Sequence, residues 1–156
     1  VASLGPRRRV RYLLLEPFTI HDVKVDDPDA KVRELLEMFD LGGELAMPEY
    51  QALDEAEVMR LETAIDRWNE ELGPLKNFIM PGGSRLIALA HLCRSLARTC
   101  ERRCQQLNAS EPLRAVGLAY LNRLSDLFFV AARLIARCQD RAEILWQAAH
   151  APNPQT

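Results

Sequence analysis

The chain has 156 residues, of which 48% are apolar and 27% are charged, and its formal net charge is −2. This length predicts one domain over residues 1–156, with enough buried surface for a core that needs no disulfide or metal. The slight negative charge argues against a nucleic-acid partner, and because no apolar run approaches ~18 residues we expect no membrane partner either. The chain opens with Val1 and shows no secretory signal.

The N-terminal residues 1–27 show no helical pattern and are predicted to be irregular. Their basic run "PRRRVRY" indicates either a solvated segment or a phosphate contact. Asp27 and Pro28 then fit a helix start, with an N-cap followed by proline at the first helical position. We expect this first helix to end near Leu45, where Gly42 and Gly43 either permit close helix packing or loosen the last turns. Its apolar residues at helical spacing are Val32, Leu35, Leu36 and Phe39.

Two further helices are predicted on either side of the corner "NFIMPGGS". The first is expected to start at Asp54, with Glu57 completing a capping box, and to end at Gly73. Its predicted buried stripe is Val58, Leu61, Ile65, Trp68 and Leu72. The second is expected from about Ser84 to Leu107. Its predicted core stripe is Leu89, Cys93, Leu96, Cys100 and Leu107, and the opposite side carries His91, Arg94, Arg98, Glu101 and Arg102.

A fourth helix is predicted after "ASEP", with Ser110 as its N-cap. Its expected core face is Leu113, Val116, Tyr120, Leu124, Leu127, Ala131, Leu134 and Cys138, and its other face carries Asn122, Asp126 and Arg133. A short last helix is expected from Asp140, because Glu143 again stands in the capping-box position. The sequence therefore predicts an all-α, up-and-down bundle of four or five helices over residues 28–150.

The four cysteines are Cys93, Cys100, Cys104 and Cys138, and none forms a CxxC pair. Structural zinc prefers tightly paired ligands, so reduced, buried thiols in a cytoplasmic protein are the better interpretation. We assign no residue to a metal. A di-iron bundle would need Glu-x-x-His pairs on facing helices, and the sequence has none.

A row of arginines follows the Pro-Gly-Gly corner. Arg94, Arg98 and Arg102 share one helix face, and a helix N-terminus flanked by arginines can bind phosphate oxygens. A solvated surface is the alternative interpretation. Asn122 and Asp126 lie one turn apart, which indicates either a polar face with an Arg–Asp pair or an amide that orients a sugar or base.

Two long stretches carry a resemblance to a known family. "FIMPGGSRLIALAHLCRSLARTCERR" and "YLNRLSDLFFVAAR" closely resemble motifs of the PduO-type ATP:cob(I)alamin adenosyltransferases, and "FDLGGELAMP", "LETAID" and "ILW" are similar as well. The resemblance covers about Val32 to Trp146. It implies a homotrimer of five-helix bundles with the active site between neighbouring subunits. It also implies transfer of the 5′-deoxyadenosyl group of ATP to cob(I)alamin, releasing triphosphate, with Mg²⁺.

The resemblance also implies roles for particular residues. The positions implied to bind ATP are Arg94, Arg98, Glu101 and Asn122. The implied catalytic residues among them are Arg94, Arg98 and Asn122. Phe78 falls on the family's aromatic position beside the corrin, where the family displaces the lower axial ligand of cobalt, and Arg123 and Asp126 match structural or interface partners of the family motif. Because cobalt(I) is itself the nucleophile, the protein has only to place C5′ and stabilise charge on the departing triphosphate.

The chain departs from the family pattern in two places. The Thr-Lys/Arg-Thr-Gly-Asp loop that wraps ATP phosphates and the Asp-Glu-Leu-Asn segment after it are not found, and Thr99 replaces the second arginine of an Arg-Arg pair. The alternative interpretation is therefore a catalytically impaired relative, a non-enzymatic trimeric cobalamin-binding or scaffold module. A cobalamin reductase or an adenosylcobalamin-dependent enzyme is a further expected partner.

Overall fold

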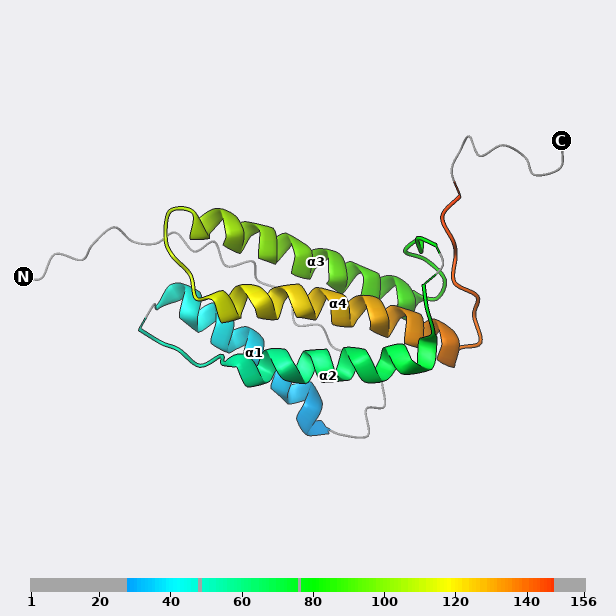
Figure 1. Cartoon of the computed structure of the whole chain (residues 1–156), viewed down its shortest axis with the longest axis horizontal. Coiled ribbons are helices and arrows are strands. Elements are labelled where there is room, and N and C mark those ends of the chain that lie inside the picture. The colour runs from blue at the N-terminus through cyan, green and yellow to red at the C-terminus, as the bar shows by residue number, and fades with distance from the viewer. Residues whose placement is uncertain (1–27, 48, 76, 148–156) are drawn as a thin grey trace, which may run out of the picture. The chain divides into compact units, whose positions relative to one another are not determined.

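The computed structural model describes residues 28–47, 49–75 and 77–147, with side chains from residue 37 onward. It has four α-helices, α1 (Pro28–Ala46), α2 (Glu55–Leu72), α3 (Arg85–Asn108) and α4 (Ala115–Cys138), shown in Figure 1. The predicted all-α class is confirmed. The chain divides into two compact units, the second beginning at Glu55. The prediction of one domain over residues 1–156 stays a prediction, and the irregular segment predicted for residues 1–27 lies outside the described residues.

The first unit is organised around the close approach of a glycine and a tyrosine. A Cβ on Gly43 would lie 2.8 Å from the Tyr50 ring, so only glycine lets that ring pack on the helix. The Tyr50 hydroxyl donates to Asp40 Oδ1 at 2.6 Å, and Glu44 Oε1 accepts from the Leu53 amide at 2.7 Å. The close neighbour of Gly43 is the Tyr50 ring and not a second helix, so the helix packing considered for the glycine pair is not what is observed at this position. Within the predicted apolar stripe only Phe39 has a described side chain, and it is exposed.

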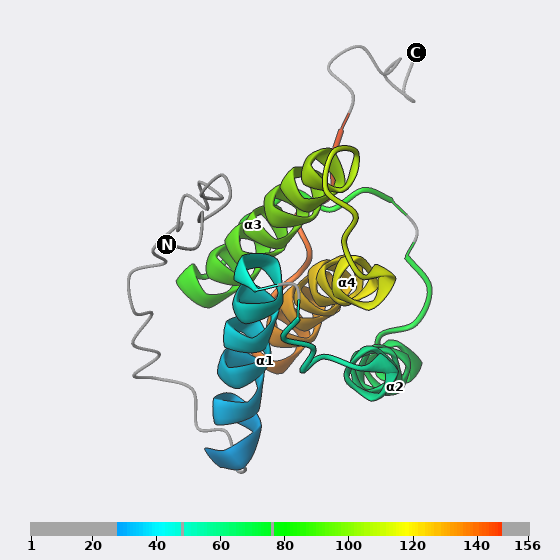
Figure 2. The same ribbon diagram turned by 90° about the vertical axis from the view of Figure 1, so that its left-hand side faces the viewer.

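The second unit is centred on α4, which lies between α2 and α3 and packs against both (Figure 2). The buried apolar residues of α4 are Tyr120, Leu121, Leu124, Val130, Ala132 and Ala136. On α2, Leu61 is fully buried while the rest of the predicted stripe is half-buried. Among the described helices only α4 is long and apolar enough to cross a membrane. A core helix has the same properties, and α4 contacts two neighbours along its length.

The core face of α3 differs from the predicted one. The predicted stripe of leucines and cysteines is only half-buried, and the buried positions are Ile87, Ala90, His91, Ala97, Glu101 and Cys104. Ile87 and Ala90 pack with Ala132 and Ala136 of α4. Small side chains let two helix backbones approach closely, although alanine gives a weaker hydrophobic signal than leucine. The observed buried face of α3 is turned about the helix axis relative to the predicted one. It therefore also includes His91 and Glu101, which were predicted to lie on the opposite, polar side.

The predicted N-cap of α4 is also wrong. The helix begins at Ala115, and Arg114 occupies the cap position without a side-chain hydrogen bond. The Ser110 hydroxyl instead donates to the Leu107 carbonyl at 3.1 Å, so it closes α3 and does not open α4. Pro112 provides the physical reason, because the residue before a proline is disfavoured in the helical conformation.

The short last helix predicted from Asp140 does not form. Asp140 has a φ of 50°, which takes the backbone out of the helical path. The segment that follows runs extended and pairs with the corner before α3. The Met80 amide donates to the Ile144 carbonyl at 2.7 Å, and the Trp146 amide donates to the Phe78 carbonyl at 2.8 Å. These bonds to distant residues replace those that an isolated helical turn would make within itself.

All four cysteines are free thiols. Cys104 is buried, whereas Cys138 at the end of α4 is exposed, contrary to its predicted core position. Burial raises the pKa of Cys93, Cys100 and Cys104 above the ordinary thiol value, which favours the neutral form. Within the described residues, no three histidine, cysteine or acidic side chains converge as metal ligands.

Candidate active site

A chain of polar side chains links α3 to α4. Glu101, which is only 9% exposed, accepts from the Arg98 guanidinium through one carboxylate oxygen. Its other oxygen accepts from Asn122 Nδ2 of the facing helix at 3.0 Å. A buried carboxylate that is paired and hydrogen-bonded on both oxygens is held firmly. Arg98 is partly exposed and presents several N–H donors beyond the Nη1 group bound to Glu101.

The same chain of contacts continues from α4 to α2 through Arg123. Arg123 Nε donates to Glu62 Oε1 at 2.7 Å, and its Nη1 donates to Asp126 Oδ2 at 2.9 Å. The pKa of Arg123 is raised by its hydrogen bond to Glu62 and then by that to Asp126. Arg123 Nη1 also approaches Asn122 Oδ1 at 3.4 Å. The amide of Asn122 therefore donates on one side and accepts on the other, which fixes its orientation.

Arg94 lies on an aromatic ring rather than on a carboxylate. Its guanidinium carbon is 5.4 Å from the centre of the Phe129 ring, a cation–π distance. The His91 ring meets the same phenylalanine edge-on at 6.3 Å. The pKa of His91 lies below its ordinary value because the ring is buried and because Arg94 is a nearby cation. His91 is therefore neutral near pH 7.

Phe129 was not predicted as a site residue, although its spacing in the sequence is informative. It lies seven residues after Asn122 and three after Asp126, so these three side chains share one face of α4. The next member of that face is Arg133, which had been assigned to the polar side. The structure instead buries Arg133 to 7% exposure. Its Nε donates to Glu143 Oε1 at 2.8 Å.

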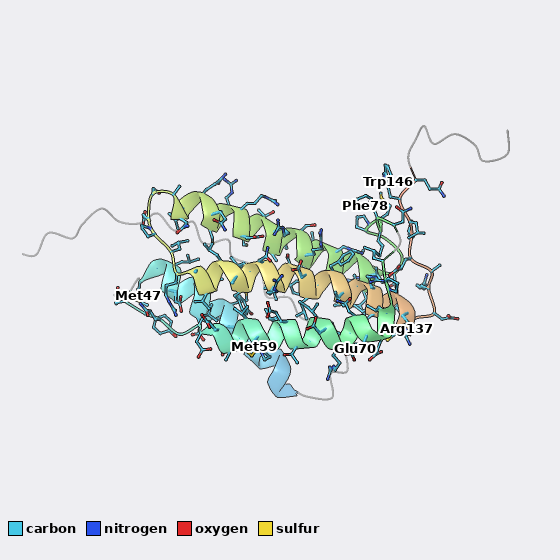
Figure 3. All side chains as sticks on the ribbon, viewed as in Figure 1. Met47, Met59, Glu70, Phe78, Arg137 and Trp146 are labelled. Carbon is cyan, nitrogen blue, oxygen red and sulfur yellow. The ribbon has the colours of Figure 1, made fainter. Side chains whose placement is uncertain are left out.

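The corner at residues 77–84 forms a second, separate region. Phe78 is 75% exposed and meets Trp146 edge-to-face, with ring centres 6.3 Å apart. Figure 3 shows these two side chains beside each other, near the start of α3. Gly83 has a φ of 114°, which glycine tolerates, and Ser84 Oγ then accepts from the Ile87 amide at 3.3 Å as the N-cap of α3. The corner therefore starts the arginine-bearing helix and leaves an aromatic ring open to solvent.

An open groove of about 610 Å³ runs between the end of α2 and α4. It is lined by Ile65, Asn69, Gly73, Pro74, Leu75, Asp126, Phe129, Val130 and Arg133. Asp126 thus contacts Arg123 on one side and faces this groove on the other. Phe129 likewise lies under Arg94 and lines the groove.

Five of the residues singled out in the sequence are brought together in one set of contacts, called the polar network below. Its members are Arg98, Glu101, Asn122, Arg123 and Asp126. Arg94 lies on Phe129, and Phe78 makes its aromatic contact with Trp146 and not with this network. Thr99, at the position where the motif has a second arginine, accepts from Arg102 Nη2 at 3.1 Å. The N-terminal phosphate-loop position lies outside the described residues.

Comparisons with known proteins agree on one family. The chain matches the family model described as cobalamin adenosyltransferase over residues 21–135. A cobalamin adenosyltransferase of Cupriavidus metallidurans is 42% identical over 135 residues, which is 86% of this chain and 71% of that protein. A corrinoid adenosyltransferase of Bacillus subtilis is 47% identical over 103 residues, covering 64% of this chain and 53% of that protein.

Solved structures give the same result. A variant PduO-type ATP:corrinoid adenosyltransferase from Lactobacillus reuteri, complexed with cobalamin and ATP, matches with a TM-score of 0.70 at 30% identity. The match covers 76% of this chain and 67% of that one. A second variant of that enzyme, complexed with ATP, matches with a TM-score of 0.69 at 30% identity, over 76% of this chain and 70% of that one.

Proposed function

Because the chain belongs to the cobalamin adenosyltransferase family, we infer that it transfers the 5′-deoxyadenosyl group of ATP to cob(I)alamin, forming adenosylcobalamin and triphosphate. Solved relatives that hold cobalamin and ATP support both substrates. The observation that carries the inference is the polar network, in which a buried Glu101 fixes Arg98 and Asn122 on neighbouring helices. Such a fixed cation suits an enzyme that must stabilise a departing polyphosphate.

At the nucleotide end, we assign ATP binding and catalysis to Arg94, Arg98 and Asn122. Negative charge grows on the triphosphate oxygen as the C5′–O bond breaks, so a planar donor fork aimed there binds the transition state more tightly than the ground state. Both oxygens of Glu101 are engaged by Arg98 and Asn122. Glu101 is therefore better suited to positioning these two groups than to touching the nucleotide.

At the corrin end, the proposal assigns Phe78 to the side of the cobalt's lower axial ligand. Cobalt(I) supplies the electron pair for the new cobalt–carbon bond, and the pair of the broken C5′–O bond leaves with triphosphate. No side chain has to be activated as a nucleophile. The high exposure of Phe78 leaves its ring available to a large flat ligand.

Mg²⁺ belongs to this proposal as a companion of ATP. The described residues offer no convergent group of three ligands for a resident ion. Mg²⁺ is usually held by one or two carboxylates together with substrate phosphates, so it would enter on the triphosphate. The protein's own contribution is then the arrangement of its arginines.

The assembly and setting of the enzyme are further parts of the proposal. We propose a homotrimer with the face of Arg94, Arg98, Asn122 and Asp126 at or near the subunit boundary, because this face is too polar for a core and too ordered for plain solvent. Sedimentation should give the trimer mass at micromolar concentration, and a monomer would contradict it. The free thiols suit a cytoplasmic location. A cobalamin reductase would supply the substrate, and an adenosylcobalamin-dependent enzyme would take the product.

The direct test is an absorbance assay for adenosylcobalamin made from ATP and chemically reduced cobalamin. We expect product only when ATP is present. A second candidate, a non-enzymatic cobalamin-binding or scaffold module, is favoured by Thr99 and by the run "PRRRVRY" at the phosphate-loop position. Cobalamin binding without any product would select this second candidate.

A further inference from the structure

A segment near the end of the described chain is tied to the corner that carries Phe78. This C-terminal strap, residues 143–146, forms an antiparallel bridge in which Leu145 is opposite Ile79. The Trp146 amide donates to the Phe78 carbonyl at 2.8 Å, and Asn77 Nδ2 donates to the Trp146 carbonyl at 3.2 Å. Trp146 thus holds the backbone of Phe78, and its indole meets the Phe78 ring in an edge-to-face contact.

The strap is itself anchored in the core of the second unit. Glu143, its first residue, pairs with Arg133 of α4, which is only 7% exposed. A buried guanidinium without a carboxylate partner is strongly unfavourable, so Arg133 holds Glu143 in a defined place. The strap is therefore tied to the core helix α4 at Glu143 and to Phe78 at Trp146, three residues further along the chain.

Phe78 depends on this support because core packing does not fix it. A phenylalanine that is 75% exposed has few neighbours to select its rotamer or to hold its main chain. The corner before α3 also contains Gly82 and Gly83, which restrict the backbone little. Within the described residues, the ring of Phe78 is therefore oriented mainly by its contact with Trp146 of the strap, which also bonds to its backbone.

We propose that Trp146, together with the Arg133–Glu143 ion pair, positions Phe78 for the corrin. This proposal rests on the proposed function, in which Phe78 faces the lower side of the cobalt. None of the three residues needs to touch substrate. Their role is to keep an exposed ring in one orientation, since a small displacement of a positioned group can cost about 10²-fold in rate.

The first experiment measures how firmly the strap is bonded to the corner, and it does not depend on enzyme activity. Amide hydrogen exchange at Met80 and Trp146 reports the two bonds that join the strap to the corner. Glu143→Gln should speed exchange at both amides by about tenfold or more, because local opening becomes easier. Glu70→Gln, an exposed substitution on α2 (Figure 3), is the matched control and should leave both rates unchanged. Equal protection in parent and Glu143→Gln would overturn the proposal.

The second experiment is a double-mutant cycle on Trp146 and Phe78. It measures the rate of adenosylcobalamin formation under conditions in which cobalt is reduced in the site. Trp146→Ala should lower kcat by roughly tenfold with little change in KM for ATP, and Trp146→Phe should recover most of the loss because it keeps a ring. In a Phe78→Ala background, Trp146→Ala should have no further effect. Losses that multiply independently of Phe78 would contradict a positioning role.

The two experiments separate failure of this proposal from failure of the proposed function. A parent chain that makes no adenosylcobalamin would refute the function, while the exchange measurement would still decide whether the strap holds the corner. A parent that is active, with a Trp146→Ala variant that retains full kcat, would refute the positioning role alone.

Discussion

The polar network and the aromatic corner are held in different ways. The network connects side chains of α3 and α4, and Arg123 joins it to Glu62 of α2. Its central carboxylate, that of Glu101, is buried and bonded on both oxygens. Phe78 is mostly exposed, and backbone bonds from a segment far along the chain restrain it. Fixed charges suit a polyphosphate, whose oxygens need donors already in place. An exposed aromatic ring on a loop suits a large flat ligand, because the ligand can reach the ring and pack against it.

The largest expected effect is at Arg98. Replacing it with Ala should lower kcat/KM for ATP by about 10²-fold, since one preorganised donor to a developing anion is worth on the order of 10²–10³ in rate. Lys keeps the charge but loses the forked geometry, so Arg98→Lys should recover only part of the loss. Arg67→Ala, an exposed position on α2, is the control. Equal behaviour of Arg98→Ala and Arg67→Ala, both folded by circular dichroism, would mean that the cationic face is ordinary surface.

Glu101 tests whether the network acts as a unit. Glu101→Gln removes the charge that holds Arg98 while keeping a similar side-chain size. We expect kcat to fall roughly thirtyfold, and we expect little further loss when the same change is made in an Arg98→Ala background. Steady-state rates of the four proteins provide the cycle. A large additional loss in the double variant would show that Glu101 acts on its own.

Phe78 should behave differently from the network. Phe78→Ala should leave ATP affinity within about twofold of the parent by calorimetry, because a residue without contact to a ligand has little effect on its binding. Adenosylation should nevertheless slow roughly tenfold when cobalt is reduced in the site. A loss of ATP affinity as large as that of Arg98→Ala would place Phe78 in the nucleotide site.

The smallest effect concerns pH and His91, whose ring meets Phe129, the phenylalanine that also contacts Arg94. Its pKa in the folded protein is below the ordinary 6.5, so between these two values the unfolded chain binds a proton that the folded chain does not. This contribution to stability is present above about pH 6.5 and is lost as the pH falls below it. Melting temperatures from about pH 7.5 to 5.5 should fall in the parent and be flatter in His91→Gln. Parallel curves would show that His91 is not the responsible group.

The helices and the polar face that carry the network were predicted from the sequence more accurately than the core packing beside them. Helix periodicity placed α1 to α3 near their observed bounds, and the spacing of Asn122 and Asp126 indicated one polar face. The core stripe of α3 was misassigned because its contact with α4 depends on small residues such as Ala90, Ala132 and Ala136, which carry little hydrophobic signal.

The contacts that hold the corner at residues 77–84 could not be predicted from local sequence patterns. The Glu143 spacing fits a helical capping box, yet its carboxylate pairs with a buried arginine on α4. Trp146 likewise bonds to Phe78, a partner 68 residues earlier in the chain (146 minus 78). The periodicity of the sequence cannot predict either pairing, because both depend on how distant segments are brought together in the tertiary fold. The family motifs identified Phe78, but they gave no indication of what holds its ring.

The most direct measurement compares two variants in two assays. Adenosylcobalamin formation is followed for Phe78→Ala and Arg98→Ala, once with cobalt(I) supplied and once with cobalt reduced in the site. If the two regions work as proposed, Arg98→Ala loses the same factor in both assays, since triphosphate departs in each. Phe78→Ala then loses several-fold more when reduction occurs in the site. Identical ratios for the two variants would contradict the division of the site into a nucleotide region and a corrin region.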